Sequence, residues 1–318
     1  MKSKVIGRAP INIALIKYWG KKDEIEVIPF QPSISLSLDV FESETTITKT
    51  KNDKFEFFLN GKENSEESQK IKKFLNYFSD DLNGVKVESK NTGPTAAGLA
   101  SSASGFAALA ITANRFFEKK FNLEKLSTIT RKGSGSAIRS LLPGCVKWNS
   151  DGSLSKLTWP FNDIRVGISI ISDKKKQIGS TKAMATSVKT SKIYNDWINQ
   201  SFIDAELFEF YKNKKDFSSL GELFEKNALL MHKVCELSNP KIQYLNSKSY
   251  ELIRLIQNSR KKGIFEAFVT MDAGPNVKII TKEKNINTIS ELLISKGYNV
   301  LWSNIDTEGA KIIYESES

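Results

Sequence analysis

Polar and apolar residues alternate through much of the first ninety positions, and this pattern predicts β-strands. Residues 33–40 alternate strictly, as in a strand with one buried face. Residues 45–50, 55–59 and 85–88 are predicted to be further strands, and the second of these runs into an Asn-Gly dipeptide typical of a tight turn. The N-terminal part of the chain is therefore expected to be rich in sheet.

Helical spacing begins near residue 101. Apolar side chains form one stripe along residues 101–118, and the serines at the start of this stretch suit a helix cap. Residues 123–132 predict a second helix. Residues 146–148 and 165–171 return to strand, and the second run is apolar enough for a central position in a sheet.

From about residue 187 the chain is predicted to be mostly helical up to residue 260, after which a Lys-Gly pair acts as a stop signal. One more helix is expected at 285–296. The remaining predicted strands are 265–271, 277–281, 299–303 and 310–314. These elements indicate an α+β fold, which we divide near residue 182 into an N-terminal domain, 1–182, and a C-terminal domain, 183–318.

Composition indicates a globular protein and leaves more than one class of binding partner open. Of the 318 residues, 40% are hydrophobic and 26% are charged, which is ordinary for a globular chain. No apolar run approaches the length of a membrane span, so no membrane segment is expected. The formal charge of +11 suits an anionic small substrate or nucleic acid, but no zinc-finger spacing or RNP-type signature supports nucleic acid.

Cysteine and histidine content limits the chemistry further. Cys145 and Cys235 lie far apart and form no ligand cluster, so we expect two reduced core thiols and a cytoplasmic setting. The single histidine, His232, excludes a multi-histidine metal site, and no G-x-S-x-G elbow accompanies it. We interpret His232 as a packing or helix-surface residue.

A loop of small residues at 94–104, Pro-Thr-Ala-Ala-Gly-Leu-Ala-Ser-Ser-Ala-Ser, is the strongest candidate for chemistry. Small residues let the backbone approach a ligand, and the helix that follows presents free N–H groups and a partial positive charge that suit phosphate. The loop lacks the Gly-Lys-Ser/Thr of a Walker A motif. A serine-capped, tightly packed helix is the competing interpretation.

Three further segments carry candidate functional groups. Hydroxyls at Ser134 and Ser136 precede Arg139, whose guanidinium fork suits a carboxylate or a phosphate. Residues 12–21 place two lysines beside an aromatic pair at a strand exit, and Asp272 opens an Asp-Ala-Gly-Pro-Asn turn. Each segment alone also fits a structural role, because aspartate is common in turns and basic turns are common on surfaces.

Together and in this order, the four segments resemble the diphosphomevalonate decarboxylases of the GHMP kinase superfamily. The matching runs are Asn-Ile-Ala-Leu-Ile-Lys-Tyr-Trp-Gly-Lys, Pro-Thr-Ala-Ala-Gly-Leu-Ala-Ser-Ser-Ala-Ser, Gly-Ser-Gly-Ser-Ala-x-Arg-Ser and Asp-Ala-Gly-Pro-Asn. Weaker matches lie at 33–38, at 179–187 and around His232, so the resemblance covers roughly residues 6–280. Runs of this length are far more specific than a single glycine pattern.

The resemblance implies a two-domain GHMP kinase fold, with an N-terminal domain like the second domain of ribosomal protein S5 and a ferredoxin-like C-terminal domain. It implies a cleft between them that binds ATP, Mg²⁺ and mevalonate 5-diphosphate, and members are commonly homodimers. The expected reaction is ATP-dependent decarboxylation of mevalonate 5-diphosphate to isopentenyl diphosphate, a step of isoprenoid biosynthesis.

By the same resemblance, Asp272 is the expected catalytic carboxylate, accompanied by Lys17, Arg139 and Asn12. The substrate is expected to contact Tyr18, Trp19, Lys21, Ser134, Ser136, Arg139 and Ser180. The nucleotide is expected over Pro94, Ala97, Gly98, Leu99, Ala100, Ser101, Ser102 and Ser104, with the metal ion near Ser102.

Three positions depart from the family pattern. Gln31-Pro32 replaces Asn-Ser, Ala183 replaces a glycine, and Thr181 stands where some bacterial members have an arginine. With fewer cations expected near the diphosphate, two alternatives of the same fold stay open, a phosphomevalonate decarboxylase and a mevalonate 3-kinase. A basic nucleic-acid-binding module is a third alternative, which the complete Asp-Ala-Gly-Pro-Asn segment disfavours because RNA binding does not need it.

Overall fold

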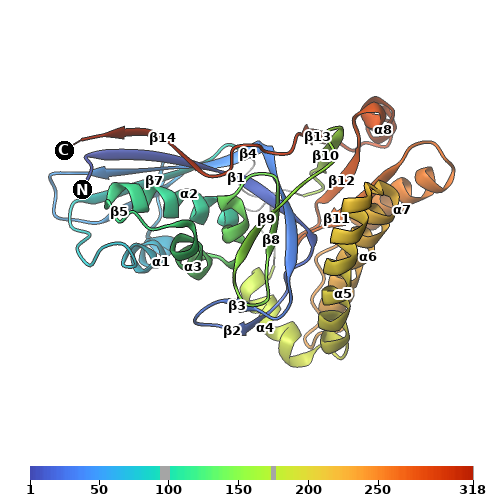
Figure 1. Ribbon diagram of the computed structural model, residues 1–318, viewed down its shortest axis with the longest axis horizontal. Helices are drawn as coiled ribbons and strands as arrows, with labels where there is room; N and C mark the ends of the chain where they lie inside the picture. The colour runs from blue at the N-terminus through green and yellow to red at the C-terminus, as the bar shows by residue number, and fades with distance from the viewer. Residues whose placement is uncertain (94–100, 173–176, 318) are drawn as a thin grey trace.

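The computed structural model describes residues 1–93, 101–172 and 177–317 of the chain. Two units lie side by side in it, each made of a sheet and helices (Figure 1). The α+β class predicted from the sequence is therefore confirmed.

The larger sheet is built on two long antiparallel strands, β1 and β4, which pair from Lys4 opposite Thr48 to Ile16 opposite Ile34. Its order is β14-β1-β4-β7-β5-β6, while β8 pairs with β4 and β9 pairs with β8. The bounds are β1 Lys4–Ile16, β4 Ser33–Lys49, β5 Glu56–Leu59, β6 Lys62–Glu63, β7 Val85–Asn91, β8 Cys145–Trp148, β9 Leu154–Leu157 and β14 Lys311–Ser316. A short hairpin, β2 Lys21–Asp23 and β3 Ile28–Pro29, follows β1.

The smaller sheet is wholly antiparallel and has the order β11-β12-β10-β13. Its strands are β10 Ile164–Ser169, β11 Ala267–Met271, β12 Val277–Lys282 and β13 Val300–Ser303. The helices are α1 Ser65–Leu75, α2 Ser101–Phe116, α3 Leu123–Gly133, α4 Ser180–Thr190, α5 Tyr194–Lys214, α6 Phe217–Glu236, α7 Ser247–Lys261 and α8 Ile286–Ser295, with 3-10 turns η1 Gly135–Leu141 and η2 Glu283–Asn285.

The chain passes from one sheet to the other at points that differ from the domain boundary expected near residue 182. β10 precedes that residue, yet it pairs with β12 and β13 of the smaller sheet. β14 follows the whole second unit, yet it pairs with β1, so both chain ends lie together at the left of Figure 1. A hydrophobic pattern identifies a strand, but contacts distant in the sequence decide which sheet the strand joins.

Several predicted elements differ from the observed ones. The strands expected at 33–40 and 45–50 are one strand, β4. Helix α1 was not predicted; the side chain of Asn64 caps it by accepting from the backbone N–H of Glu67. The segment that carries Ser136 and Arg139, for which no helix was predicted, folds as η1, and the long helical stretch divides into four helices.

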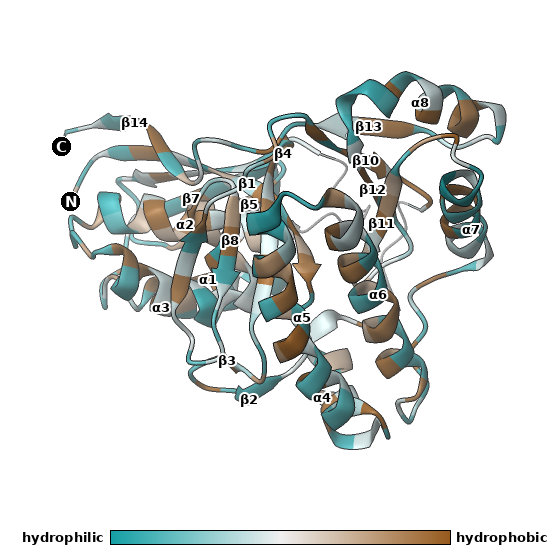
Figure 2. Cartoon of the chain, turned by 45° about the vertical axis from the view of Figure 1, so that its right-hand side comes forward, coloured by the Kyte–Doolittle hydropathy of each residue, from teal (hydrophilic) through white to brown (hydrophobic). Residues whose placement is uncertain are grey.

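An apolar core joins the two units and holds the end of β1 in place. Ile13 and Leu15 of β1 belong to the same buried cluster as Phe268 of β11 and Phe224 of α6. Helix α6 crosses β11 closely at Gly221, where a Cβ atom would lie 2.1 Å from the Phe268 ring. Figure 2 shows further apolar residues along α5 and α6. The end of β1 is therefore packed into a core that both sheets share.

Candidate active site

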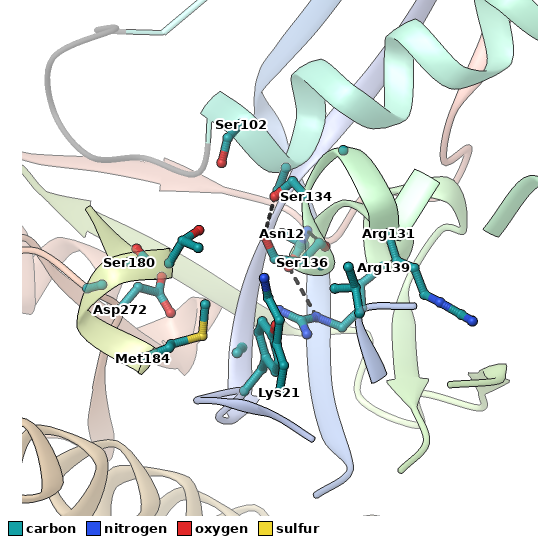
Figure 3. Close-up of a pocket in the computed structure, with 18 of the residues that line it drawn as sticks. Asn12, Lys21, Ser102, Arg131, Ser134, Ser136, Arg139, Ser180, Met184 and Asp272 are labelled. Atoms are coloured by element: carbon teal, nitrogen blue, oxygen red, sulfur yellow. Dashed lines mark hydrogen bonds between the residues drawn. The ribbon is translucent and has the colours of Figure 1, made fainter. Parts of the chain in front are cut away.

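A cavity of about 720 Å³ lies where the end of β1, the first turns of α2 and α4, the η1 segment and the turn after β11 meet (Figure 3). All four segments singled out in the sequence contribute to it. Its lining includes these expected site residues: Asn12, Lys17, Tyr18, Trp19, Lys21, Ser102, Ser134, Ser136, Arg139, Ser180 and Asp272. Segments far apart in the sequence thus converge on one cleft, as the functional interpretation of each of them requires.

Asp272 holds two buried lysines, one through each carboxylate oxygen. Nζ of Lys17 lies 2.8 Å from Oδ1, and Nζ of Lys278 lies 3.1 Å from Oδ2. The lysine side chains are 1% and 3% exposed, whereas that of Asp272 is 30% exposed and faces the cavity. Lys17 also donates to the carbonyl oxygen of Ala14 at 2.7 Å. The carboxylate is therefore held from behind and presented to the cavity.

The turn after β11 explains the position of this carboxylate. β11 ends at Met271, and the N–H of Gly274 donates to the carbonyl oxygen of Asp272 at 2.7 Å. Asn276, at the end of the turn, accepts hydrogen bonds from the backbone N–H groups of Ile171 at 2.7 Å and Ser172 at 3.1 Å. The Asp-Ala-Gly-Pro-Asn segment is thus fastened to the strand exit of β10.

Burial and neighbouring charges determine the charge states of Asp272 and Lys17. Burial would raise the pKa of Asp272, but the ammonium groups of Lys17 and Lys278 outweigh it and hold the pKa well below its usual range. Burial lowers the pKa of Lys17 to about 8, although the ion pair with Asp272 acts in the opposite direction. The carboxylate is therefore ionised at neutral pH, and Lys17 loses its proton more easily than an ordinary lysine.

Arg139 is held on the opposite side of the cavity by neutral partners. Its Nη1 donates to the hydroxyl of Ser33 at 2.8 Å, and its Nε donates to Oδ1 of Asn12 at 3.4 Å. Asn12 in turn donates to the hydroxyl of Ser140 at 2.7 Å. Burial lowers the pKa of Arg139 to about 10, so the guanidinium stays charged at neutral pH. It is a preorganised cation held without a direct carboxylate partner among the described residues.

The aromatic pair after β1 frames the cavity. The Tyr18 ring lies 4.7 Å from the Trp148 ring, and its buried hydroxyl has no hydrogen-bond partner among the described residues. Burial raises the pKa of Tyr18 well above its usual value, so the phenol stays neutral and can donate. Trp19 is buried, with its carbonyl oxygen accepting from the hydroxyl of Tyr194 at 2.7 Å.

Three further polar residues, Ser134, Ser136 and Lys21, contribute to the cavity lining. The hydroxyls of Ser134 and Ser136 lie 3.4 Å apart. Nζ of Lys21 pairs with Glu24 at 3.0 Å. All three residues line the cavity, so each can meet a ligand there.

The expected nucleotide residues divide into three groups. Ser102, in the first turn of α2, lines the cavity across from Ser180 of α4 (Figure 3). Ser104 does not: it is buried, and its hydroxyl lies 2.7 Å from that of Ser43. Pro94, Ala97, Gly98, Leu99 and Ala100 lie outside the described residues, and Ser101 is described only as the first residue of α2.

Sequence reasoning missed several charged residues of the site. Lys278 lies between Val277 and two isoleucines, and a charged residue within such an apolar run could have identified it. Lys70, Arg131 and Lys132 add positive charge to the lining, and Glu67 adds a negative one. Arg131 and Lys132 came from segments interpreted as helices, where basic residues are common on the surface.

The remaining expectations concern thiols, histidine and metal. Cys145 and Cys235 are free and buried, as expected, and burial raises the pKa of each to about 12. His232 is buried rather than on a helix surface. No group of three His, Cys, Asp or Glu residues in the described part of the chain could hold a metal ion, and none of its helices is long and apolar enough to span a membrane.

Comparison with protein-family models identifies both units of the chain. Residues 9–157 match the diphosphomevalonate decarboxylase-like N-terminal domain, and residues 166–308 match the mevalonate 5-diphosphate decarboxylase C-terminal domain. The first range ends with β9 and the second begins within β10, the two strands between which the pairing changes sheets.

Curated relatives and solved structures give the same picture. The diphosphomevalonate decarboxylase of Debaryomyces hansenii is 35% identical over 94% of this chain and 85% of its own. The human enzyme is 35% identical over 87% of this chain and 76% of its own. The crystal structure of the mevalonate diphosphate decarboxylase from Staphylococcus aureus superimposes with a TM-score of 0.92 at 36% identity, covering 99% of both chains. A structure described as MDDEF in complex with MVAPP, AMPPCP and magnesium superimposes with a TM-score of 0.91 at 35% identity, covering 99% of this chain and 100% of its own.

Proposed function

Because this chain belongs to the diphosphomevalonate decarboxylase family, with its two-domain fold, we propose that it catalyses the ATP-dependent decarboxylation of mevalonate 5-diphosphate. The products are isopentenyl diphosphate, ADP, phosphate and carbon dioxide. The observation that carries this proposal is the carboxylate of Asp272, which Lys17 and Lys278 hold at the cavity wall opposite the Arg139 guanidinium. A substrate with one hydroxyl to deprotonate and one carboxylate to bind needs this pair of groups.

The cavity fits a nucleotide and its metal ion. Lysines and arginines outnumber acidic residues in its lining, and α2 has no acidic residue in its first turn, where Ser102 lies. With no cluster of acidic ligands among the described residues, Mg²⁺ would rely on phosphate oxygens and the Ser102 hydroxyl. When bound, Mg²⁺·ATP supplies the phosphoryl group that turns the tertiary 3-hydroxyl into a leaving group.

Asp272 accepts the proton of that hydroxyl. A carboxylate stabilised by two ammonium groups is a weak base, so it takes up the proton only after the new O–P bond has made the hydroxyl acidic. Lys17 lines the cavity next to it and balances the negative charge that gathers there. This order fits a reaction in which positioning and charge, rather than strong basicity, do most of the catalysis.

Arg139 binds the substrate carboxylate and Asn12 holds the guanidinium in place. Departure of phosphate builds positive charge on the tertiary carbon. The cations that surround this carbon disfavour a free carbocation, so loss of carbon dioxide keeps pace with loss of phosphate. Tyr18, Trp19, Lys21, Ser134, Ser136 and Ser180 would contact the rest of the substrate, and the unpartnered Tyr18 hydroxyl is the clearest donor among them.

A parallel assay tests this function. Purified protein is given Mg²⁺·ATP with mevalonate, its 5-phosphate or its 5-diphosphate, and ADP, phosphate and carbon dioxide are measured. The proposal predicts equal amounts of all three products, with the 5-diphosphate as the preferred substrate. Preference for the 5-phosphate would indicate a phosphomevalonate decarboxylase. Accumulation of a stable 3-phosphorylated compound would indicate a 3-kinase, and ATP hydrolysis that responds only to RNA would overturn the enzyme assignment.

The proposal also covers the oligomeric state and the cellular location of the protein. The protein acts as a cytoplasmic homodimer: its family resemblance supports the dimer, and its two free, buried cysteines suit a reducing compartment. Light scattering after gel filtration should give twice the monomer mass of 35.7 kDa. A mass equal to the monomer across micromolar concentrations would contradict the dimer.

A further inference from the structure

Lys278 is a buried lysine flanked by apolar residues on β12. Its neighbours on β12, Val277, Ile279 and Ile280, are fully buried. Its own side chain is 3% exposed, and Nζ lies 3.1 Å from Oδ2 of Asp272. Lys278 is not among the described residues that line the cavity, so it reaches the site only through Asp272.

Stability alone gives little reason for a lysine at this position. A buried ammonium group costs free energy unless it is paired, and an apolar side chain of similar size would fill the strand without that cost. Asp272 already has a buried partner in Lys17, which balances its charge. Lys278 therefore adds a surplus positive charge to the three-residue group.

The two lysines bind different oxygens of one carboxylate. A single partner at Oδ1 would leave the carboxylate free to rotate about its Cβ–Cγ bond, whereas partners at both oxygens fix its plane. Lys17 lines the cavity, so an anionic ligand there can compete with Asp272 for its ammonium group. Lys278 does not line the cavity, so its contact with Oδ2 is not open to such competition.

We propose that Lys278 is a positioning residue for Asp272: its ammonium anchors Oδ2, so that the carboxylate keeps one orientation and stays ionised while Lys17 engages the ligand. This inference rests on the proposed function, in which Asp272 meets the substrate hydroxyl.

Titratable groups from four elements face Asp272: Lys17 after β1, Arg139 of η1, His232 of α6 and Lys278 of β12. Burial lowers the pKa of His232 to about 3, so it is neutral above pH 5. Lys278 lowers the pKa of both Asp272 and Lys17, since a nearby cation favours the unprotonated form of each. Removing its charge should therefore move both titrations to higher pH.

Two substitutions and a matched control test the proposal. Lys278→Met removes the charge and the hydrogen-bond donor, while Lys278→Gln removes the charge and keeps a donor. Lys282→Met is the control, because Lys282 lies four residues further along β12 and forms a comparable ion pair with Glu266 at 3.0 Å, outside the cavity. The carboxyl titration of Asp272 is followed by ¹³C NMR in the ligand-free protein, and kcat and KM are measured from pH 5 to pH 10.

In wild type, the Asp272 carboxyl should stay ionised down to the lowest pH at which the protein is folded. In Lys278→Met, its titration and the alkaline limb of kcat should both move up by about one pH unit or more, as expected when a neighbouring charge is lost. We expect kcat to fall about 10–100-fold with KM within about threefold, the pattern of an interaction made in the transition state. Lys278→Gln should show the same pH shifts with a smaller loss of kcat.

An Asp272 titration that is unchanged in either folded Lys278 variant would overturn the proposal. An equal loss of kcat in Lys282→Met would also overturn it, because the effect would then belong to the strand rather than to Asp272. If Lys278→Met fails to fold, the Asp272 titration and kcat of Lys278→Gln alone test the proposal. Absence of carbon dioxide release from wild type would contradict the proposed function instead, and the NMR titration would still test the anchor.

Discussion

Asn227, on α6, accepts a hydrogen bond through Oδ1 from the backbone N–H of Lys17 at 2.9 Å. Its Nδ2 donates to Oδ2 of Asp204, on α5, at 2.7 Å, and all three residues are buried. β1 ends at Ile16, so a backbone N–H that the sheet no longer pairs is held by a helix of the other unit. The position of Lys17 against Asp272 thus depends on two helices as well as on its own strand.

Asn227→Leu should destabilise the protein and impair catalysis. The substitution keeps the volume but leaves the N–H of Lys17 and the carboxylate of Asp204 without this partner. A buried polar group left unpaired costs about 1–3 kcal/mol, and more for a charged group, so the free energy of unfolding in urea should fall by at least that amount. Asn258→Leu, on the exposed side of α7, is the control. A stability loss no larger than that of the control would contradict this role.

The lowered pKa of Lys17 predicts a pH dependence. Below pH 8 its ammonium is charged and supports Asp272, and above about pH 8 it loses its proton. The value of kcat/KM should therefore decrease above about pH 8. Lys17→Arg stays charged through this range, so its profile should lack that limb whatever its absolute activity. A limb of the same midpoint in Lys17→Arg would assign the titration to another group.

Arg139→Lys keeps the charge but loses the planar fork that Ser33 and Asn12 orient. Since charged hydrogen bonds contribute about 1.5–3 kcal/mol, kcat/KM should fall about 10–100-fold. Arg165→Lys, which changes an arginine paired with Glu283 at 2.8 Å away from the cavity, serves as the control. Near-normal turnover in Arg139→Lys would exclude a direct contact with the substrate carboxylate.

Ser102→Ala tests the nucleotide side of the cavity. Loss of its hydroxyl should raise the KM for ATP several-fold, and the required Mg²⁺ concentration should rise with it. The free energy of unfolding should change by no more than about 1 kcal/mol, the usual worth of a hydroxyl at a helix start. Ser65→Ala, at the start of α1, is the matched control. A lower melting temperature with unchanged ATP kinetics would instead indicate a purely structural hydroxyl.

Much of the site could be predicted because its motifs are continuous in the sequence. Tyr18, Arg139 and Asp272 each belong to a run whose residue order alone identified it, and the structure brings those runs together. The α+β class followed from the same local patterns.

The parts that could not be predicted depend on contacts between distant residues. β14 pairs with β1 across nearly the whole chain, and no local pattern specifies that partner. Asn227 acts through hydrogen bonds to Lys17 and Asp204, which leave no periodic signal. Ser104 follows Ser102 by two residues and so points elsewhere on the helix, toward Ser43.

Asp272→Asn should lower the stability of the protein as well as its activity, and the two effects can be separated. The amide cannot balance two ammonium groups, so the melting temperature should fall along with activity. Asp272→Asn combined with Lys278→Met removes one of the unpaired charges and should recover part of the lost stability. Turnover should remain low in both variants, which separates the loss of the carboxylate from any loss of fold.

The most direct test of the central claim is therefore the steady-state turnover of folded Asp272→Asn with Mg²⁺·ATP and mevalonate 5-diphosphate. If Asp272 accepts the proton of the 3-hydroxyl, kcat should fall by about 10²–10⁴-fold while both KM values stay within a few-fold of wild type. An aspartate that only caps a turn predicts the opposite, because asparagine serves turns nearly as well. A folded Asp272→Asn variant with kcat within a few-fold of wild type would contradict the account.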